Sequence, residues 1–296
     1  MPSCLEAHAF RHTAAIATYH QPLLGRSPPG SSRPDLGIMA ATTVAAMPAI
    51  VGLQTTLTVD DMNRSNTIYN GLPRINPKMS VNEDHVKNLE AIIAQRNLRE
   101  KLGIHLLHKH DDLPKGQIKL ETKMQTIAGK WGRPASIGSL DLGKIHGVVF
   151  KFVPEENILI PYEFAMGPSP VARSNMVESC IKVILGYVAG NDLANVIALE
   201  LLEPVNDSQP MGPAAEIEVG EHGTIVLPKA MVDAVEFIPT GWPDVTLNYD
   251  PDSKSRPQTE WARLRPEDNH KVYTRQVENE KQLLDELALQ GILIKD

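Results

Sequence analysis

Apolar residues follow helical spacing in three segments of the chain. The first begins at Ser80-Val-Asn-Glu83, which matches a capping box, in which the serine side chain accepts from a free amide and the glutamate reaches back. Apolar positions at helical spacing follow it, and Gly103 is a typical stop. Ser174 precedes a second apolar stripe in the same way. The pattern predicts helices over 81–101, 175–189 and 275–290.

Shorter runs, in which apolar and polar residues alternate or apolar residues are continuous, predict strands. Residues 104–110 and 117–123 flank the turn Asp111–Gly116, which indicates a hairpin. Pro161 cannot donate to a strand ladder, so its strand is expected to lie at an edge or to bulge there. The other predicted elements are a hairpin of 147–153 and 158–164, strands over 196–202 and 224–227, and a long surface loop over 239–269.

Helices interleave with hairpins along the chain, and no repeated strand–helix–strand unit occurs. This order favours an α+β fold, with a mostly antiparallel sheet and a few flanking helices. Residues 55–296 are expected to form a single α+β domain. Residues 1–54 are rich in Pro, Ser, Ala and Gly and have no sustained helical or strand period, so they predict a disordered N-terminal extension.

The N-terminal residues also bear on location. Residues 1–38 contain few acids and several arginines, as transit peptides do, but their prolines would break an amphipathic helix. Met39-Ala-Ala resembles an ordinary cytosolic start, so the start of translation at Met1 or Met39 stays open. These features favour a cytoplasmic protein over mitochondrial targeting by residues 1–38. No apolar run reaches the ~20 residues that a membrane helix requires.

Composition narrows the class of protein. The 296 residues are 42% apolar and 22% charged, which is ordinary for a globular protein with a buried core. The net charge of −7 argues against a nucleic-acid partner bound by bulk electrostatics. The two cysteines exclude a disulfide framework and a Cys-rich zinc site. Cys180 lies on the apolar side of its predicted helix and is expected to be a buried thiol.

The segment Gly103–Leu113 concentrates the chemistry, because three of the ten histidines fall within six positions and two aspartates follow. Histidine and aspartate can bind a transition metal or transfer protons near neutral pH. In a strand, His108 and His110 would share one face and His105 would point to the other. Residues two apart in a strand lie roughly 6.6–6.8 Å apart, so His108 and His110 could converge on a divalent metal or act as an acid–base pair.

Further side chains could complete such a site. Glu121, His146 and Glu163 lie on or near predicted strands and are candidates for a third metal ligand. Glu163 stands between Tyr162 and Phe164, so partial desolvation could raise its pKa and suit it to general acid catalysis. In the alternative interpretation, the histidines bond neighbouring groups on a half-buried strand and Glu163 faces water.

Two short motifs resemble a set of uncharacterised fungal proteins. Leu107-His-Lys-His110 with Asp112-Leu113 is similar to a Leu-Leu-His-Arg-His-Phe-Asp-Leu segment, and Pro161-Tyr-Glu-Phe164 matches a Pro-Tyr-Glu-Phe segment. Lys109 replaces the Arg and Asp111 replaces the Phe. The resemblance spans about 102–202 and implies a fungal source. By analogy with other fungal orphan proteins, it implies a role in specialised metabolism.

Two functional hypotheses follow. In the first, the chain is an enzyme that acts on a small organic molecule, with His108, His110 and Glu163 as catalytic residues or with His108 and His110 as ligands of a divalent metal. In the second, it is a noncatalytic binding or interaction protein whose histidines are structural. Neither hypothesis includes a nucleic acid or a membrane as partner. The sequence leaves the substrate, the reaction and the oligomeric state open.

Overall fold

The structure is a computed structural model of the chain, and it describes residues 46–53, 55–203, 213–242, 259–264, 272 and 277–294. The chain divides into two units. The first, residues 1–45, includes most of the expected N-terminal extension and lies outside the described residues. A second unit begins at Ala46 and contains all the helices and strands described below.

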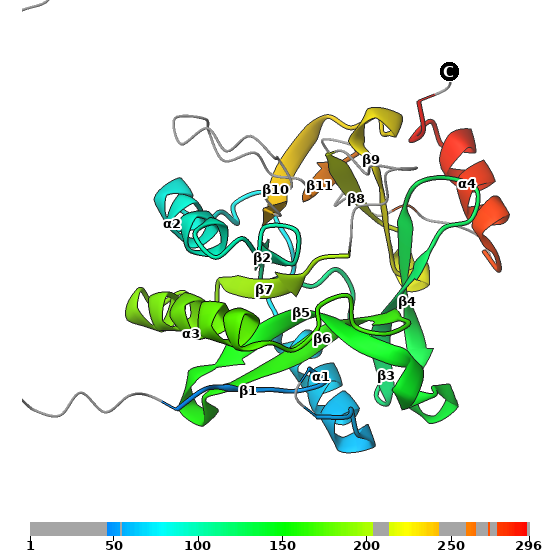
Figure 1. The fold of residues 1–296 in the computed structure, drawn as a ribbon. Coiled ribbons are helices and arrows are strands. Elements are labelled where there is room, and N and C mark those ends of the chain that lie inside the picture. The colour runs from blue at the N-terminus through cyan, green and yellow to red at the C-terminus, as the bar shows by residue number, and fades with distance from the viewer. Residues whose placement is uncertain are drawn as a thin grey trace, which may run out of the picture. The chain divides into compact units, whose positions relative to one another are not determined.

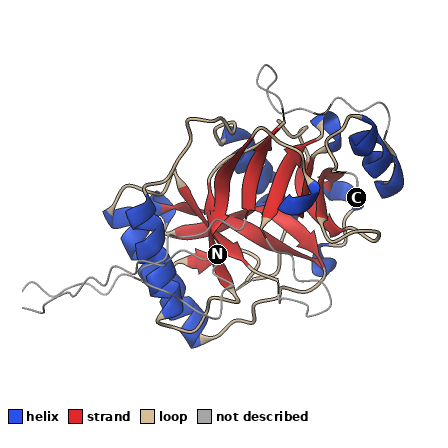
Figure 2. Cartoon of the chain, turned by 90° about the horizontal axis from the view of Figure 1, so that it is seen from above, coloured by secondary structure: helices blue, strands red, loops and turns tan. Residues whose placement is uncertain are grey.

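Within the described residues, ten strands close into a barrel, and an eleventh, β1, adds to the outside of the ring at β6 (Figure 1, Figure 2). The order around the ring is β6-β3-β4-β9-β8-β11-β10-β2-β7-β5, and β5 pairs with β6 to close it. Three of the pairings (β1–β6, β3–β6 and β8–β11) are parallel and the others are antiparallel. The strands are β1 (Ala49–Ile50), β2 (Leu102–Leu106), β3 (Gln117–Lys123), β4 (Lys130–Ser136), β5 (Ile145–Val153), β6 (Ile158–Met166), β7 (Ile197–Leu201), β8 (Ala214–Glu218), β9 (Thr224–Pro228), β10 (Glu236–Trp242) and β11 (Thr259–Arg263).

Four α-helices of the described residues pack on this barrel. Helices α2 and α3 lie side by side on one side of it (Figure 1), and their apolar faces share a cluster with β2, β5 and β7. Helix α1 contacts β6 and β3, whereas α4 packs onto the cluster around β8 and β9. No helix in the described part combines the length and apolar character needed to cross a bilayer. The helices are α1 (Val59–Gly71), α2 (Glu83–Ala94), α3 (Asn175–Gly190) and α4 (Glu280–Leu289).

The structure thus confirms an α+β fold with a mostly antiparallel sheet and flanking helices, and it adds that the sheet is closed. The fold begins earlier than residue 55, where the domain was expected to start. Ala49 and Ile50 pair with Ile158 and Leu159 of β6, and the Ile50 side chain is buried in the core.

The three predicted helices are confirmed in kind, but α2 is shorter than the predicted 81–101 at both ends. It ends at Ala94, and Gly103, the expected stop, lies within β2. Asn82, not Ser80, caps this helix, because its side chain accepts a hydrogen bond from the Asp84 amide at 2.9 Å. A capping box does form in the chain, but between Thr58 and Asp61 at α1, a helix that the apolar pattern did not predict.

The local hairpin of 147–153 and 158–164 is confirmed as β5–β6, with a register shift beside Phe150, the partner of Pro161. The predicted hairpin of 104–110 with 117–123 is wrong. Strand β2 ends at Leu106 and pairs with β7 and β10, while β3 pairs with β4 and β6. The expected surface loop 239–269 is wrong over 239–242 and 259–263, which belong to β10 and β11; residues 243–258 and 265–269 lie outside the described residues.

Alternation along β3 shows how the barrel separates its two faces. Ile118 and Leu120 pack outward into the apolar cluster that includes Met62 of α1. Lys119 and Glu121, which alternate with these two residues along the strand, line a cavity inside the barrel. The interior therefore carries charged side chains, which ordinarily remain at the surface.

Candidate functional site

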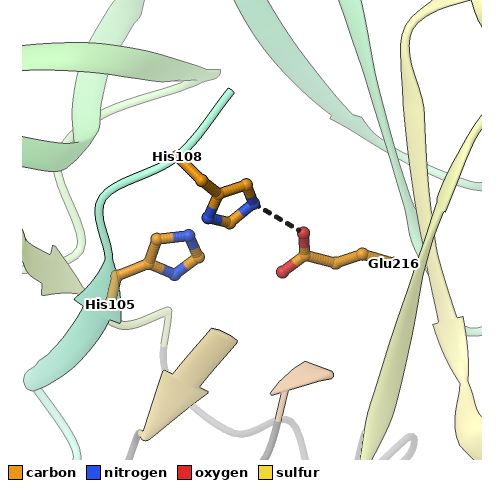
Figure 3. Close-up of side chains that lie close together, drawn as sticks. All are labelled: His105, His108 and Glu216. Atoms are coloured by element: carbon orange, nitrogen blue, oxygen red, sulfur yellow. Dashed lines mark hydrogen bonds and ion pairs between the residues drawn. The ribbon is translucent and has the colours of Figure 1, made fainter. Parts of the chain in front are cut away.

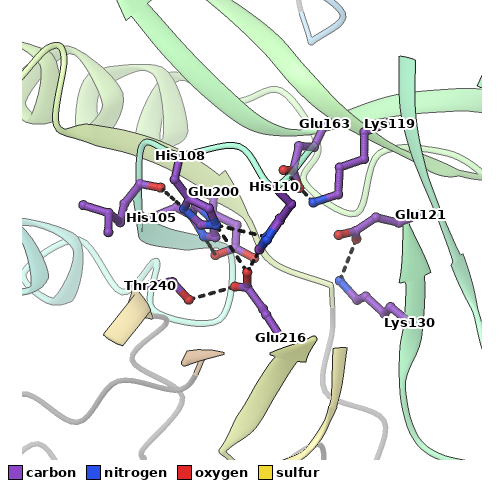
Figure 4. A network of polar contacts seen from close by, with 11 residues as sticks. His105, His108, His110, Lys119, Glu121, Lys130, Glu163, Glu200, Glu216 and Thr240 are labelled. Atoms are coloured by element: carbon purple, nitrogen blue, oxygen red, sulfur yellow. Dashed lines mark hydrogen bonds and ion pairs between the residues drawn. The ribbon is translucent and has the colours of Figure 1, made fainter. Parts of the chain in front are cut away.

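The barrel encloses an inner cavity of about 60 Å³. Its wall is unusually rich in ionisable side chains, contributed by strands from around the ring (Figure 4). Burying so many charges is costly unless each is paired or held by hydrogen bonds. Its charged lining residues are His105, Lys119, Glu121, Lys130, Glu163, Glu200 and Glu216.

The histidine segment is held in place by backbone bonds after β2 ends. The Leu107 amide donates to the Val196 carbonyl at 2.8 Å, and the Lys109 amide donates to the Pro73 carbonyl at 2.9 Å. The Lys109 side chain pairs with Asp112 at 2.7 Å. The two histidines flanking Lys109 are buried at 1% and 2% exposure and both reach Glu216 inside the barrel.

His105 lies with the other two histidines, which corrects the prediction that it would face away. Its ring stacks on that of His108, with centroids 5.2 Å apart and planes at 20°. The His110 ring meets His108 edge-on, at 4.8 Å and 85°. Because the strand stops at Leu106, strict alternation does not continue as far as His108.

Glu216 of β8 is the acid at the centre of this cluster (Figure 3). Its Oε2 lies 3.3 Å from His108 Nε2 and 3.0 Å from His110 Nε2, and the two nitrogens are 3.2 Å apart. Thr240 Oγ1 donates to the other carboxylate oxygen at 2.8 Å. His108 Nδ1 lies 2.8 Å from the Leu106 carbonyl, so it carries the proton and donates.

Electrostatics keep the acid ionised. Burial raises the pKa of Glu216, but the adjacent His108 and His110 outweigh it and hold the pKa well below its usual range. Burial lowers the pKa of His110 to about 4 in spite of Glu216, so this ring is neutral at pH 7. For His105, burial lowers the pKa, yet the neighbouring Glu200 carboxylate, 3.8 Å from His105 Nδ1, raises it above its ordinary value.

The three residues named from sequence as a third ligand do not join the histidines. Glu121 pairs with Lys130 at 3.3 Å, Glu163 pairs with Lys119 at 2.9 Å, and His146 Nδ1 donates to the Gly167 carbonyl at 2.9 Å. The acid that does join them, Glu216, was missed. The available signal was Ala-Ala-Glu-Ile-Glu218, a short strand with acids at alternate positions.

Glu163 is buried at 5% exposure, so it does not face water, and its charge state also differs from the expected one. Burial raises its pKa, but the charges of Lys119 and His105 lower it more, so the net shift is downward. Glu163 is therefore a carboxylate at neutral pH and lacks the proton that a general acid needs.

A larger pocket of about 540 Å³ lies outside the inner cavity. Glu121 and Lys130 line both spaces, so their ion pair stands at the junction. His146 lines the outer pocket, and its Nε2 is buried without a hydrogen-bond partner. Lys123 also lines this pocket, where it pairs with Glu203 at 2.8 Å.

The cluster supports two kinds of chemistry. Neutral and charged imidazoles beside a carboxylate can relay protons. Ligand atoms of His105, His108 and Glu216 also lie within 4.8 Å of one another, close enough to surround a metal ion (Figure 3). His110 Nε2 is nearer still to His108 and Glu216, at 3.2 and 3.0 Å (Figure 4).

With this geometry in place, likeness to other proteins offers no further guide to the function. Comparisons of the chain with protein-family models, with curated proteins and with solved structures find no match.

Proposed function

We propose that the chain is an enzyme acting on a small polar organic molecule inside the barrel, with His108, His110 and Glu216 at its chemical centre. The observation that carries this proposal is the set of ionisable side chains around the inner cavity. Each buried ion costs several kcal/mol in desolvation, and an apolar interior is often at least as stable. Shifted ionisable groups that face a cavity are typical of catalytic sites.

The two neighbouring spaces fit a small molecule. A volume of about 540 Å³ for the outer pocket is within the common range for such sites, roughly 300–1,000 Å³. The inner cavity of about 60 Å³ admits only a small polar group. We therefore place the body of the molecule in the outer pocket and its reacting group beyond Glu121 and Lys130.

Unsatisfied polar atoms favour an enzyme over structural histidines. Among the described residues, His110 Nδ1 and Tyr162 Oη are buried and make no hydrogen bond, and His105 Nδ1 and Glu200 Oε2 face each other at 3.8 Å, beyond hydrogen-bond distance. Structural histidines would be expected to have satisfied partners, because an unsatisfied buried group costs about 1–3 kcal/mol. A bound polar molecule can supply partners for such atoms. The short sequence resemblance adds to this proposal a role in fungal specialised metabolism.

The test is to incubate the purified chain with an extract of polar metabolites and to follow all compounds by mass spectrometry. We expect the wild type to consume at least one compound and His108→Gln to leave it intact. Lys130→Met should slow consumption, because Lys130 lines both spaces. Lys144→Met is the control, since Lys144 is exposed and pairs only locally with Asp141.

Two results would overturn the proposal. If the wild type neither binds nor consumes any compound, the barrel interior is not a small-molecule site. If a compound binds and is recovered chemically unchanged, the noncatalytic binding protein is the correct alternative.

A further inference from the structure

We infer that His108, His110 and Glu216 bind one divalent transition-metal ion, with an open coordination position toward the inner cavity beside His105. This inference rests on the proposed function, because it specifies what the chemical centre holds. It assigns the cluster to metal binding rather than to proton relay alone.

The spacing of the three ligand atoms supports a metal directly. His108 Nε2, His110 Nε2 and Glu216 Oε2 are separated by 3.2, 3.3 and 3.0 Å. Ligand atoms at about 2.0–2.2 Å from a metal, at tetrahedral or octahedral angles, are separated by about 3.0–3.5 Å. The three distances are therefore those of ligand atoms that share one ion.

The hydrogen bond of His108 orients its other ring nitrogen toward the proposed ion. Its Nδ1 faces the Leu106 carbonyl at 2.8 Å, and a carbonyl can only accept, so the proton is on Nδ1. In the neutral ring, Nε2 then presents a lone pair to Glu216 Oε2, a second acceptor, at 3.3 Å. Two acceptors at this distance repel unless a proton or a cation lies between them.

The groups behind these side chains are those expected behind metal ligands. Metal-bound histidines typically donate their other N–H to a carbonyl or carboxylate, and ligating carboxylates are themselves hydrogen-bonded. For His108, the Leu106 carbonyl is the group that accepts the N–H of Nδ1. Thr240 Oγ1 hydrogen-bonds the carboxylate by donating to Glu216 Oε1 at 2.8 Å, which leaves Oε2 to face the histidines (Figure 4).

Charge balance in the cavity points the same way. Four glutamates and two lysines line it, so the wall carries a net charge of −2 when the histidines are neutral. An uncompensated buried charge is costly, and a bound cation would offset the excess of carboxylates. Two imidazole nitrogens with one carboxylate suit Zn²⁺, Fe²⁺ or Co²⁺ better than Mg²⁺ or Ca²⁺, which prefer oxygen ligands.

The experiment uses Co²⁺ as the probe, since its visible absorption reports its coordination. The full chain is first dialysed against a chelator and then titrated. We expect one equivalent of Co²⁺ to bind, Zn²⁺ to displace it, and excess Mg²⁺ to leave it in place. Thr240→Val should weaken binding by about 10–100-fold, the usual effect of losing a group behind a ligand.

Variants locate the site. His108→Ala and Glu216→Gln should abolish the Co²⁺ spectrum, whereas His222→Ala should keep it, because His222 lies outside the cluster and pairs weakly with Glu221 at 3.9 Å. Circular dichroism confirms that each variant is folded. If a variant is unfolded, the wild-type titration alone decides.

Folded wild-type protein that binds neither Co²⁺ nor Zn²⁺ would overturn the inference, and so would loss of binding in His222→Ala equal to that in His108→Ala. The proposed function fails separately. If the protein binds no metal but consumes a metabolite, the metal site is wrong and the enzyme is still supported. Metal binding without any metabolite bound or consumed supports the metal site and overturns the enzyme.

Discussion

Replacing Lys119 by methionine should leave a buried, unpaired carboxylate at Glu163. The two residues are register partners on parallel strands β3 and β6, and Lys119 Nζ lies 2.9 Å from Glu163 Oε1. Both are buried, at 6% and 5% exposure. Methionine keeps the apolar stem of the lysine, so the change removes the ammonium group and little packing. Gly132 provides the room for this stem, because a Cβ there would lie 2.9 Å from Lys119 Cε.

The magnitude follows from the geometry. At 2.9 Å and an effective dielectric constant of about 20, two unit charges attract by roughly 6 kcal/mol. Desolvation of both groups offsets much of this attraction, so the pair itself stabilises the fold by less. Removing one partner instead leaves the other charge uncompensated, which costs about 3–5 kcal/mol. That is a large share of the roughly 5–15 kcal/mol by which a domain is stable.

The loss should depend on pH. In the wild type, burial raises the pKa of Glu163 but Lys119 and His105 lower it more. A lowered native pKa contributes stability above the unfolded value of about 4.3, and this stability is lost as pH falls through the native pKa. Without Lys119, burial dominates and the native pKa rises above 4.3. The variant's deficit should then be full at pH 8 and shrink toward pH 5, as Glu163 takes up a proton.

Urea denaturation at pH 8 and pH 5.5, followed by tryptophan fluorescence, measures both effects. The control is Lys119→Met with Glu163→Gln, which should be more stable than Lys119→Met at pH 8, with a deficit that no longer varies with pH. A deficit of the same size at both pH values, or a double variant weaker than the single one, would refute the reasoning.

Two further predictions concern local structure. Asn82→Ala should lower the free energy of unfolding by about 0.5–2 kcal/mol because Asn82 caps α2, whereas Ser80→Ala should change it little; equal losses in urea denaturation would return the helix start to Ser80. Burial raises the pKa of Cys180 to about 11, so its reactive thiolate appears only as pH rises toward that value. In a Cys4→Ser background, a thiol reagent at pH 8 should label Cys180 only after unfolding, and rapid labelling of native protein would contradict this.

Local patterns carried the successful sequence predictions. Helix α3 follows from Ser174 and an apolar stripe, and the β5–β6 hairpin follows from two apolar runs around a short turn. Each is set by residues close together in the chain. Cys180 was placed correctly for the same reason, because its position on the stripe of α3 decides its burial.

The closed sheet and the acid of the site depend on pairings between distant residues. Nothing near residues 102–106 indicates that β2 pairs with β10 and β7 rather than with β3. Glu216 reaches the histidines because β8 lies only three places from β2 around the ring, so its role could not be read from spacing. The orientation of His105 failed for a different reason, since a strand was extended past the point where it ends at Leu106.

The closure of the ring also bears on how the protein folds in time. His105 on β2 pairs with Gly241 on β10, so β2 is fully paired only after a strand far along the chain has formed. Contacts between such distant residues bring a large entropic cost of loop closure and slow folding. Until the strands meet, Glu216 and the histidines keep their water. The charged interior therefore loses its hydration in the closing step, and its desolvation adds to the barrier there.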